Sequence, residues 1–336
     1  MQEQALAHIR TLTEYLAANR GSLTIDADTH ATDTGRYPPR QEPGYYHGRP
    51  LSAQDLVAEM DLAEVSMANI WQNPAATLYP GDPDRNAEAL LAANEYVASC
   101  AVRYAGRFIP SGWTDPSACG VDNACRIAEI CVRRFGFLMV KMNPAQNRFP
   151  IDSENVLKVV DRIVELGAIA VFHYGADTPF TPASGLEALA LRYPEHPLVA
   201  VHMGGGGAGY VEADPLYRES IELGLRRPNI RFILSALRDN YIEEALIRYQ
   251  MAGEPFRRHL FCASDAPYGR MAWNFGGFRW LFRGLMKTTS HPDPRVRDNP
   301  NLFDLESVQD YMGGNFADFV CAGYANLLRK QQLAAF

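Results

Sequence analysis

The chain has 336 residues, of which 47% are hydrophobic and 21% charged, a composition that excludes a disordered protein. Its formal charge of −7 provides no basic field for nucleic acid or an anionic membrane, so we expect a small-molecule substrate. The length permits either one large α/β barrel or two medium domains.

The predicted elements begin with a helix at 3–19, where apolar residues recur every three or four positions. We interpret residues 1–22 as an N-terminal helical extension. Short apolar, β-branched runs then alternate with longer amphipathic stretches, which is the pattern of parallel βα units. The predicted strands are 23–27, 64–70, 107–111, 136–142, 168–173, 198–202, 230–235 and 260–264.

Helical stretches separate these strands, at 53–63, 85–104, 154–166, 185–192, 215–225 and 241–250. Eight parallel strands with intervening helices predict an α/β fold, a (β/α)₈ TIM barrel over residues 23–336. An open doubly wound sheet is the alternative, but no Gly-x-Gly-x-x-Gly motif follows the first strand. We expect long loops after strands 1 and 8, at 32–50 and 266–294.

The cysteines and the apolar runs indicate the compartment. The six cysteines include no Cys-x-x-Cys pair, which indicates reduced thiols and not a disulfide scaffold. The first residues lack the features of a signal peptide, and no run of about 18 apolar residues occurs. We therefore expect a cytoplasmic protein that has no contact with a membrane.

Carboxylate and imidazole side chains follow four of the strands. The first strand runs into the sequence DADTH, where a period of two puts Asp28 and His30 on one face. His173 ends the fifth strand, His202 ends the sixth, and Asp265 follows the eighth. A single such residue is usually structural. Four coincidences at the strand ends, where barrel active sites lie, instead predict a metal-type site.

Four motifs occur in order: GFLMVKMNPAQNRFP at the fourth strand, HMGG after the sixth, SDAP after the eighth, and GN within GGNFADFV. In these motifs the chain resembles the amidohydrolase superfamily, specifically the branch of aminocarboxymuconate semialdehyde decarboxylase-like proteins, from residue 23 onward. Many superfamily members have His-x-His on the first strand, whereas this chain has Asp28-x-His30. Carboxylate-x-His also occurs in this branch, so the departure argues mainly against a binuclear centre.

By position, the resemblance implies one divalent metal ion held by Asp28, His30, His173 and Asp265. Imidazoles together with carboxylates suit Zn²⁺, and Mn²⁺ is the alternative. The resemblance also implies catalytic roles for Asp265 and His202. Asp265 would accept the proton of a metal-activated water, and His202 would stabilise an oxyanion or serve as the acid.

Further residues are expected around these ligands. Lys141 ends the fourth strand, where binuclear relatives use a modified lysine as a bridge, and we favour a cationic substrate anchor or a buried structural ammonium over that bridge. Arg238 could bind a substrate carboxylate, and its alternative is a surface salt bridge. Tyr46 and Trp273 lie in the two long loops, whose aromatic residues are expected to enclose the substrate. Asp26 is expected to orient a neighbouring ligand.

Three classes of function fit these residues. The sequence HYGADTPF after the fifth strand resembles the hydrolase-type members of the family, which implies a metal-dependent hydrolase of an amide, lactone or related bond in a small organic acid. The alternative is a non-oxidative decarboxylase of an aromatic or unsaturated carboxylic acid. Related decarboxylases often have an acidic residue, or a glycine-rich turn that ends in an aromatic-proline pair, shortly after the histidine of the sixth strand, and HMGGGGAGY matches neither pattern. A catalytically silent barrel is disfavoured by the intact ligands, and a homo-oligomer remains open.

Overall fold

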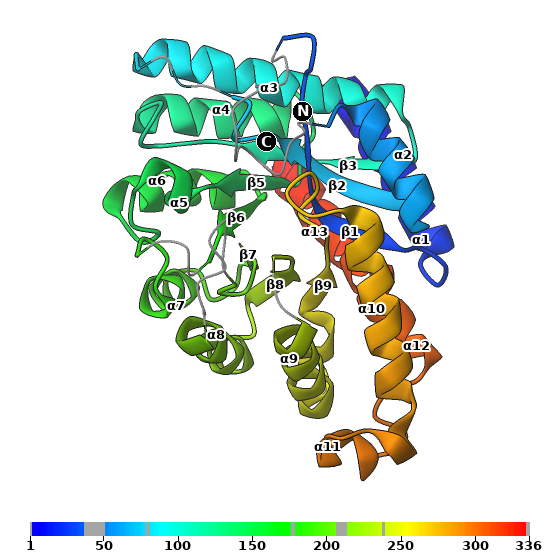
Figure 1. Ribbon diagram of the computed structural model, residues 1–336. Coiled ribbons are helices and arrows are strands. Elements are labelled where there is room, and N and C mark those ends of the chain that lie inside the picture. Colours follow the sequence, from blue (N-terminus) through cyan, green and yellow to red (C-terminus); the bar gives the residue numbers. More distant parts are fainter. Residues whose placement is uncertain are drawn as a thin grey trace, which may run out of the picture.

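The computed structural model describes residues 2–36, 51–77, 79, 81–175, 179–205, 214–236 and 239–333. Helices surround a set of parallel strands (Figure 1). The strands are β1 (Ile25–Ala31), β2 (Met67–Gln72), β3 (Phe108–Pro110), β4 (Gly112–Trp113), β5 (Met139–Met142), β6 (Ile169–His173), β7 (Leu198–Val201), β8 (Ile230–Leu234) and β9 (Leu260–Cys262). The α-helices are α1 (Glu3–Asn19), α2 (Ala53–Ala63), α3 (Pro83–Arg103), α4 (Val121–Arg133), α5 (Pro144–Asn147), α6 (Glu154–Glu165), α7 (Ala183–Arg192), α8 (Asp214–Arg226), α9 (Asp239–Ala252), α10 (Met271–Met286), α11 (Pro294–Arg297), α12 (Leu305–Gln309) and α13 (Asn315–Leu333).

The strands pair in two parallel ladders, β1-β2-β3 and β4-β5-β6-β7-β8-β9. Ser111 separates β3 from β4, and its N–H still donates to the carbonyl of Ile70 on β2. At the other end, the N–H of Asp265 after β9 donates to the carbonyl of Asp28 on β1 at 3.0 Å. A parallel bridge between Thr29 and Ala266 extends this contact. The prediction of a barrel of parallel strands is confirmed, with β3 and β4 as its third strand.

Capping residues in the sequence determine where helices on the barrel surface begin. Ser52 and Asp55 form a capping box at the start of α2, each side chain bonding the backbone N–H of the other residue. Asp82 caps α3, and Pro83 follows at its first position, where a missing N–H costs nothing. The expected helix at 3–19 is confirmed as α1, which packs against α13 with Ile9, Leu12 and Leu16 in the core.

The segment 266–294 was expected to be a long loop, and this is wrong for most of its length. Residues 271–286 form helix α10, which packs against α2. Buried Phe275, Phe278, Leu281, Phe282 and Leu285 provide the reason, because they recur at helical spacing on one face. No helix among the described residues is long and apolar enough to cross a membrane.

His259, just before β9, is buried at 1% exposure, and its Nδ1 has no hydrogen-bond partner among the described residues. Burial and then the charge of Arg231 lower the pKa of His259 to about 3. The folded state therefore resists protonating a group that the unfolded chain protonates near its model value of 6.5. Stability from this residue is present above pH 6.5 and is lost as the pH falls toward 3.

We expect wild-type protein to lose stability relative to His259→Asn as the pH falls from 7.5 to 5, at roughly 1.4 kcal/mol per pH unit below 6.5. Urea unfolding of both proteins at the two pH values measures this difference, and titrations common to both cancel. Parallel pH dependences for the two proteins would contradict the assignment.

Candidate metal centre

Three predicted site residues come together at the carboxyl ends of the strands. Asp28 lies on β1, His202 directly follows β7, and Asp265 lies beyond β9. Each offers one ligand atom, and these atoms all lie within 4.8 Å of one another. Ligand atoms bound to one ion at about 2 Å are themselves about 3–4 Å apart, so a small cation fits this group with modest adjustment.

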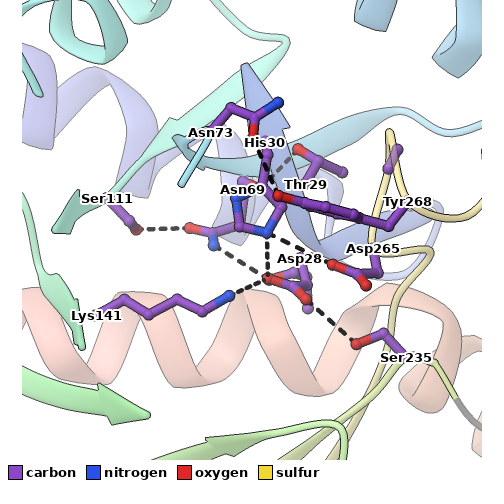
Figure 2. A network of polar contacts seen from close by, with 12 residues as sticks. Asp28, Thr29, His30, Asn69, Asn73, Ser111, Lys141, Ser235, Asp265 and Tyr268 are labelled. Carbon is purple, nitrogen blue, oxygen red and sulfur yellow. Dashed lines mark hydrogen bonds and ion pairs between the residues drawn. The ribbon is translucent and has the colours of Figure 1, made fainter. Parts of the chain in front are cut away.

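His30 faces the same two carboxylates (Figure 2). Its Nε2 lies 3.8 Å from Oδ1 of Asp28 and 3.5 Å from Oδ1 of Asp265. Its Nδ1 is 2.9 Å from the carbonyl oxygen of Gln72, which can only accept a hydrogen bond. Nδ1 of His30 therefore carries a proton, and Nε2 is the nitrogen that points toward the carboxylates. This is the arrangement that a metal-ligating histidine adopts.

His173, at the end of β6, is half-buried and lies beside His202. The centroids of the two imidazole rings are 4.6 Å apart, with the rings edge to face. His173 is not a member of the group within 4.8 Å, whereas His202, which we expected to stand apart from the ligands, is a member. The assignment of His173 as a ligand and of His202 as a catalytic group therefore stays a prediction.

Lys141, on β5, is 1% exposed, and its Nζ is 2.9 Å from Oδ1 of Asp28. The same Nζ lies 5.2 Å from the ring centroids of Trp71 and of Trp113. A cation is stabilised between two aromatic faces and beside a carboxylate, whereas a carboxylated lysine would bring a second negative charge there. This environment supports an ammonium group on Lys141, paired with Asp28, and disfavours a carboxylated Lys141 that bridges two metal ions.

The charge states of Asp28 and His202 follow from their surroundings. Burial alone would raise the pKa of Asp28, but the charge of Lys141, together with those of His30 and His202 at low pH where imidazoles are protonated, outweighs it and holds that pKa well below its usual range. Burial lowers the pKa of His202 to about 4. At neutral pH, Asp28 is therefore ionised and His202 is neutral, the forms in which both residues bind metals.

The chain turns sharply where it enters this site. His202, Ala236 and Asp265 follow β7, β8 and β9, and their φ angles are 76°, 52° and 59°. Residues other than glycine rarely adopt this left-handed region, and such strain collects at functional sites. Strand alternation alone could not predict where the side chains of His202 and Asp265 point, because these turns re-aim them.

Asp26 lies one pair deeper on β1, as expected, and is fully buried. It accepts hydrogen bonds from the N–H groups of Asp28 at 3.2 Å and Ser264 at 3.0 Å, and from the Ser264 hydroxyl at 2.5 Å. Burial raises its pKa to about 8. Asp26 thus links β1 to the segment that carries Asp265, which supports its expected role of orienting neighbouring ligands.

Two of the predicted substrate contacts, Tyr46 and Arg238, lie outside the described residues. Trp273 is in the first turn of α10 and is 79% exposed. Tyr268, which sequence analysis missed, lies nearer to the site: its ring meets His30 edge to face at 5.3 Å, and its hydroxyl donates to Asn73 at 3.0 Å. Its place three residues after Asp265 was the available signal.

The donor set suits a divalent cation, because it combines carboxylates with imidazoles whose other nitrogen is already hydrogen-bonded. Imidazole and carboxylate ligands fit both Zn²⁺ and Mn²⁺.

The chain was compared with known families and with solved structures. A structure of 5-carboxyvanillate decarboxylase from Novosphingobium aromaticivorans, complexed with manganese and 4-hydroxy-3-methoxy-5-nitrobenzoic acid, is 16% identical, with a TM-score of 0.63 over 90% of this chain and 97% of that one. The 2,6-dihydroxybenzoate decarboxylase from Rhizobium is 17% identical, with a TM-score of 0.55 over 76% and 92%. A probable 2-pyrone-4,6-dicarboxylic acid hydrolase from Acinetobacter baumannii is 14% identical, with a TM-score of 0.53 over 86% and 99%.

At these low sequence identities, the likeness shows a shared fold and nothing further. No curated protein matches the sequence significantly. The family model described as amidohydrolase matches residues 25–260, a span that runs from β1 to the start of β9 and holds all but one of the expected metal ligands. Because this match covers more than half of the sequence, the chain belongs to the amidohydrolase family.

Proposed function

We propose that this protein is a metal-dependent, non-oxidative decarboxylase of an aromatic carboxylic acid. The observation that carries the proposal is the group formed by Asp28, His202 and Asp265 at the carboxyl ends of the barrel strands. Two of the three similar structures described above are decarboxylases of hydroxylated benzoates, which favours this function over the hydrolase expected from sequence.

The proposed ligands of the ion are Asp28, His30, His173 and Asp265, and the distances support adding His202. A bound divalent ion supplies Lewis-acid chemistry by polarising the oxygens of an adjacent hydroxyl and carboxylate on the substrate. Mn²⁺ is the first ion to test, because the structure from N. aromaticivorans holds manganese, and Zn²⁺ is the second.

Decarboxylation breaks the bond between the ring carbon and the carboxylate, and that carbon must gain a proton as CO₂ leaves. Asp28 is poorly suited to deliver it, because the Lys141 ammonium and the Ser235 hydroxyl both donate to its oxygens. The Asp265 side chain is 14% exposed at the mouth, and its Oδ1 lies 3.5 Å from Nε2 of His30. We therefore assign proton transfer to Asp265: it would accept the proton of the substrate hydroxyl and deliver it to the ring carbon as CO₂ leaves, and the resulting phenolate would regain a proton from water.

The burial of Lys141 also changes its proposed role. An ammonium group that is 1% exposed and paired with Asp28 is better suited to hold that carboxylate ionised than to bind substrate. Of the two roles expected for Lys141, we therefore favour the buried structural ammonium, which supports Asp28, over the substrate anchor.

A hydrolase is the second candidate, favoured by the fold that this chain shares with the probable pyrone dicarboxylate hydrolase. The same ligands serve both reactions, so the products must distinguish them. We expect metal-free protein reloaded with Mn²⁺ or Zn²⁺ to release CO₂ and an equimolar phenol from a hydroxybenzoate such as 2,6-dihydroxybenzoate or 5-carboxyvanillate.

Carbon-13 labelling of the substrate carboxylate lets CO₂ be followed directly, and 2-pyrone-4,6-dicarboxylate is the hydrolase substrate in parallel. The metal-free protein and Asp28→Asn serve as controls that should lose activity. Ring opening of the pyrone without CO₂ release would overturn the decarboxylase assignment, as would no CO₂ release from a panel of hydroxybenzoates at saturating metal.

A further inference from the structure

Ser235 connects two residues of the metal centre. It directly follows β8, is 1% exposed, and was not singled out by sequence analysis. Its Oγ lies 2.9 Å from Nδ1 of His202 and donates to Oδ2 of Asp28 at 3.2 Å. Figure 2 shows the contact between Ser235 and Asp28, on the side of the carboxylate away from Lys141. The hydroxyl is therefore a bridge between a carboxylate and an imidazole.

The direction of each hydrogen bond in this bridge is determined. The Lys141 ammonium donates to Asp28 at 2.9 Å in a buried ion pair, and the ionised carboxylate of such a pair can only accept hydrogen bonds. The Ser235 hydroxyl has one proton, and it donates this proton to the carboxylate of Asp28. The oxygen of Ser235 then accepts from His202, so Nδ1 of His202 carries a proton whether the ring is neutral or charged.

We propose that Ser235 is a positioning residue that holds His202 in the Nδ1–H form and so directs the lone pair of Nε2 into the metal centre. The inference rests on the proposed function, because it assigns a role within that centre. It makes His202 a ligand or a proton acceptor at Nε2. His202 cannot then serve as the resting acid that we expected from sequence.

His30 provides an independent parallel within the same site. The Gln72 carbonyl fixes its proton on Nδ1, and its Nε2 faces Asp28 and Asp265. The two imidazoles are thus oriented by partners from neighbouring strands, Gln72 on β2 and Ser235 after β8. For His202 the partner is a side chain, which mutation can remove.

The first test is the tautomer of His202 in metal-free wild-type protein labelled with ¹⁵N-histidine. Two-bond ¹H–¹⁵N spectra distinguish a protonated from an unprotonated ring nitrogen, and His202→Gln identifies the signals. We expect Nδ1 to be protonated and Nε2 to be unprotonated. A neutral ring with its proton on Nε2 would overturn the proposal without reference to any variant or to activity.

The second test is Mn²⁺ binding by Ser235→Ala, which we expect to raise the Kd about 10–100-fold, as is typical when a hydrogen-bond partner of a ligand is removed. Ser235→Thr keeps the hydroxyl and should restore most of the affinity. Ser111→Ala is the matched control, since Ser111 is also a buried serine beside a strand end, but it donates to Asn69.

Unchanged Mn²⁺ affinity in folded Ser235→Ala would overturn the role of the hydroxyl. An equal loss in Ser111→Ala would also overturn it, because the effect would then be a general consequence of removing a buried hydroxyl. Both tests use metal binding and the ring tautomer. A protein that releases no CO₂ would therefore refute the proposed function and leave this inference to be judged separately.

Discussion

Asp265→Asn is expected to lower kcat for CO₂ release by about 10²–10⁴-fold, the usual cost of losing one group that transfers a proton. Asparagine has nearly the same size and can still present an oxygen to the site, but it has no carboxyl proton to deliver. Asp28 cannot take over, because Lys141 and Ser235 already donate to its oxygens.

The measurement is kcat at saturating Mn²⁺, with the metal content of the variant determined in the same samples, so that loss of metal is separated from loss of proton transfer. Asp298→Asn is the control, since Asp298 is 68% exposed beside Arg297. A kcat within threefold of wild type in metal-loaded Asp265→Asn would contradict the assignment of proton transfer to this residue.

Lys141→Met is expected to destabilise the metal-free protein by about 3–5 kcal/mol, because it leaves the buried charge of Asp28 without its partner. Methionine keeps the length and the apolar contacts with Trp71 and Trp113 but removes the ammonium group. Lys158→Met is the matched control. Lys158 pairs with Glu154 at 3.0 Å on the surface, at 55% exposure, so its loss should cost less than about 1 kcal/mol.

Urea unfolding at pH 7 measures both variants. The double variant Asp28→Asn/Lys141→Met removes both charges and should recover part of the lost stability, because no unpaired buried charge remains. Equal effects of the two lysine substitutions would contradict the importance of the buried pair. Failure of the double variant to recover any stability would indicate that packing, and not charge, explains the loss.

Local pattern determined much of the fold. The eight expected strands all correspond to strands of the barrel, and the helix at 3–19 has the predicted bounds. Apolar periodicity is a property of neighbouring residues, so sequence alone reveals it. The one large error, at 266–294, came from its glycine and aromatic content. Phe275, Phe278 and Phe282 already recur there at helical spacing.

Topology extended this local information to the candidate site. Parallel strands in a barrel bring their carboxyl ends to one mouth. For this reason, Asp28, His30, His202 and Asp265 could be expected to lie together although they are far apart in the sequence. No single residue was a sufficient signal, but carboxylate and imidazole residues at several strand ends together predicted a shared site.

Only the tertiary structure decided how these residues are held. Lys141 lies between two tryptophans from other strands, and Ser235 bonds Asp28 across 207 positions of sequence. The left-handed backbone conformations of His202 and Asp265 give their side chains directions that differ from those of a regular strand. Such partners depend on which strands become neighbours and on turns at their ends. The sequence by itself determined which candidate ligands reach the mouth of the barrel, and packing between distant strands determined their charge, direction and partners.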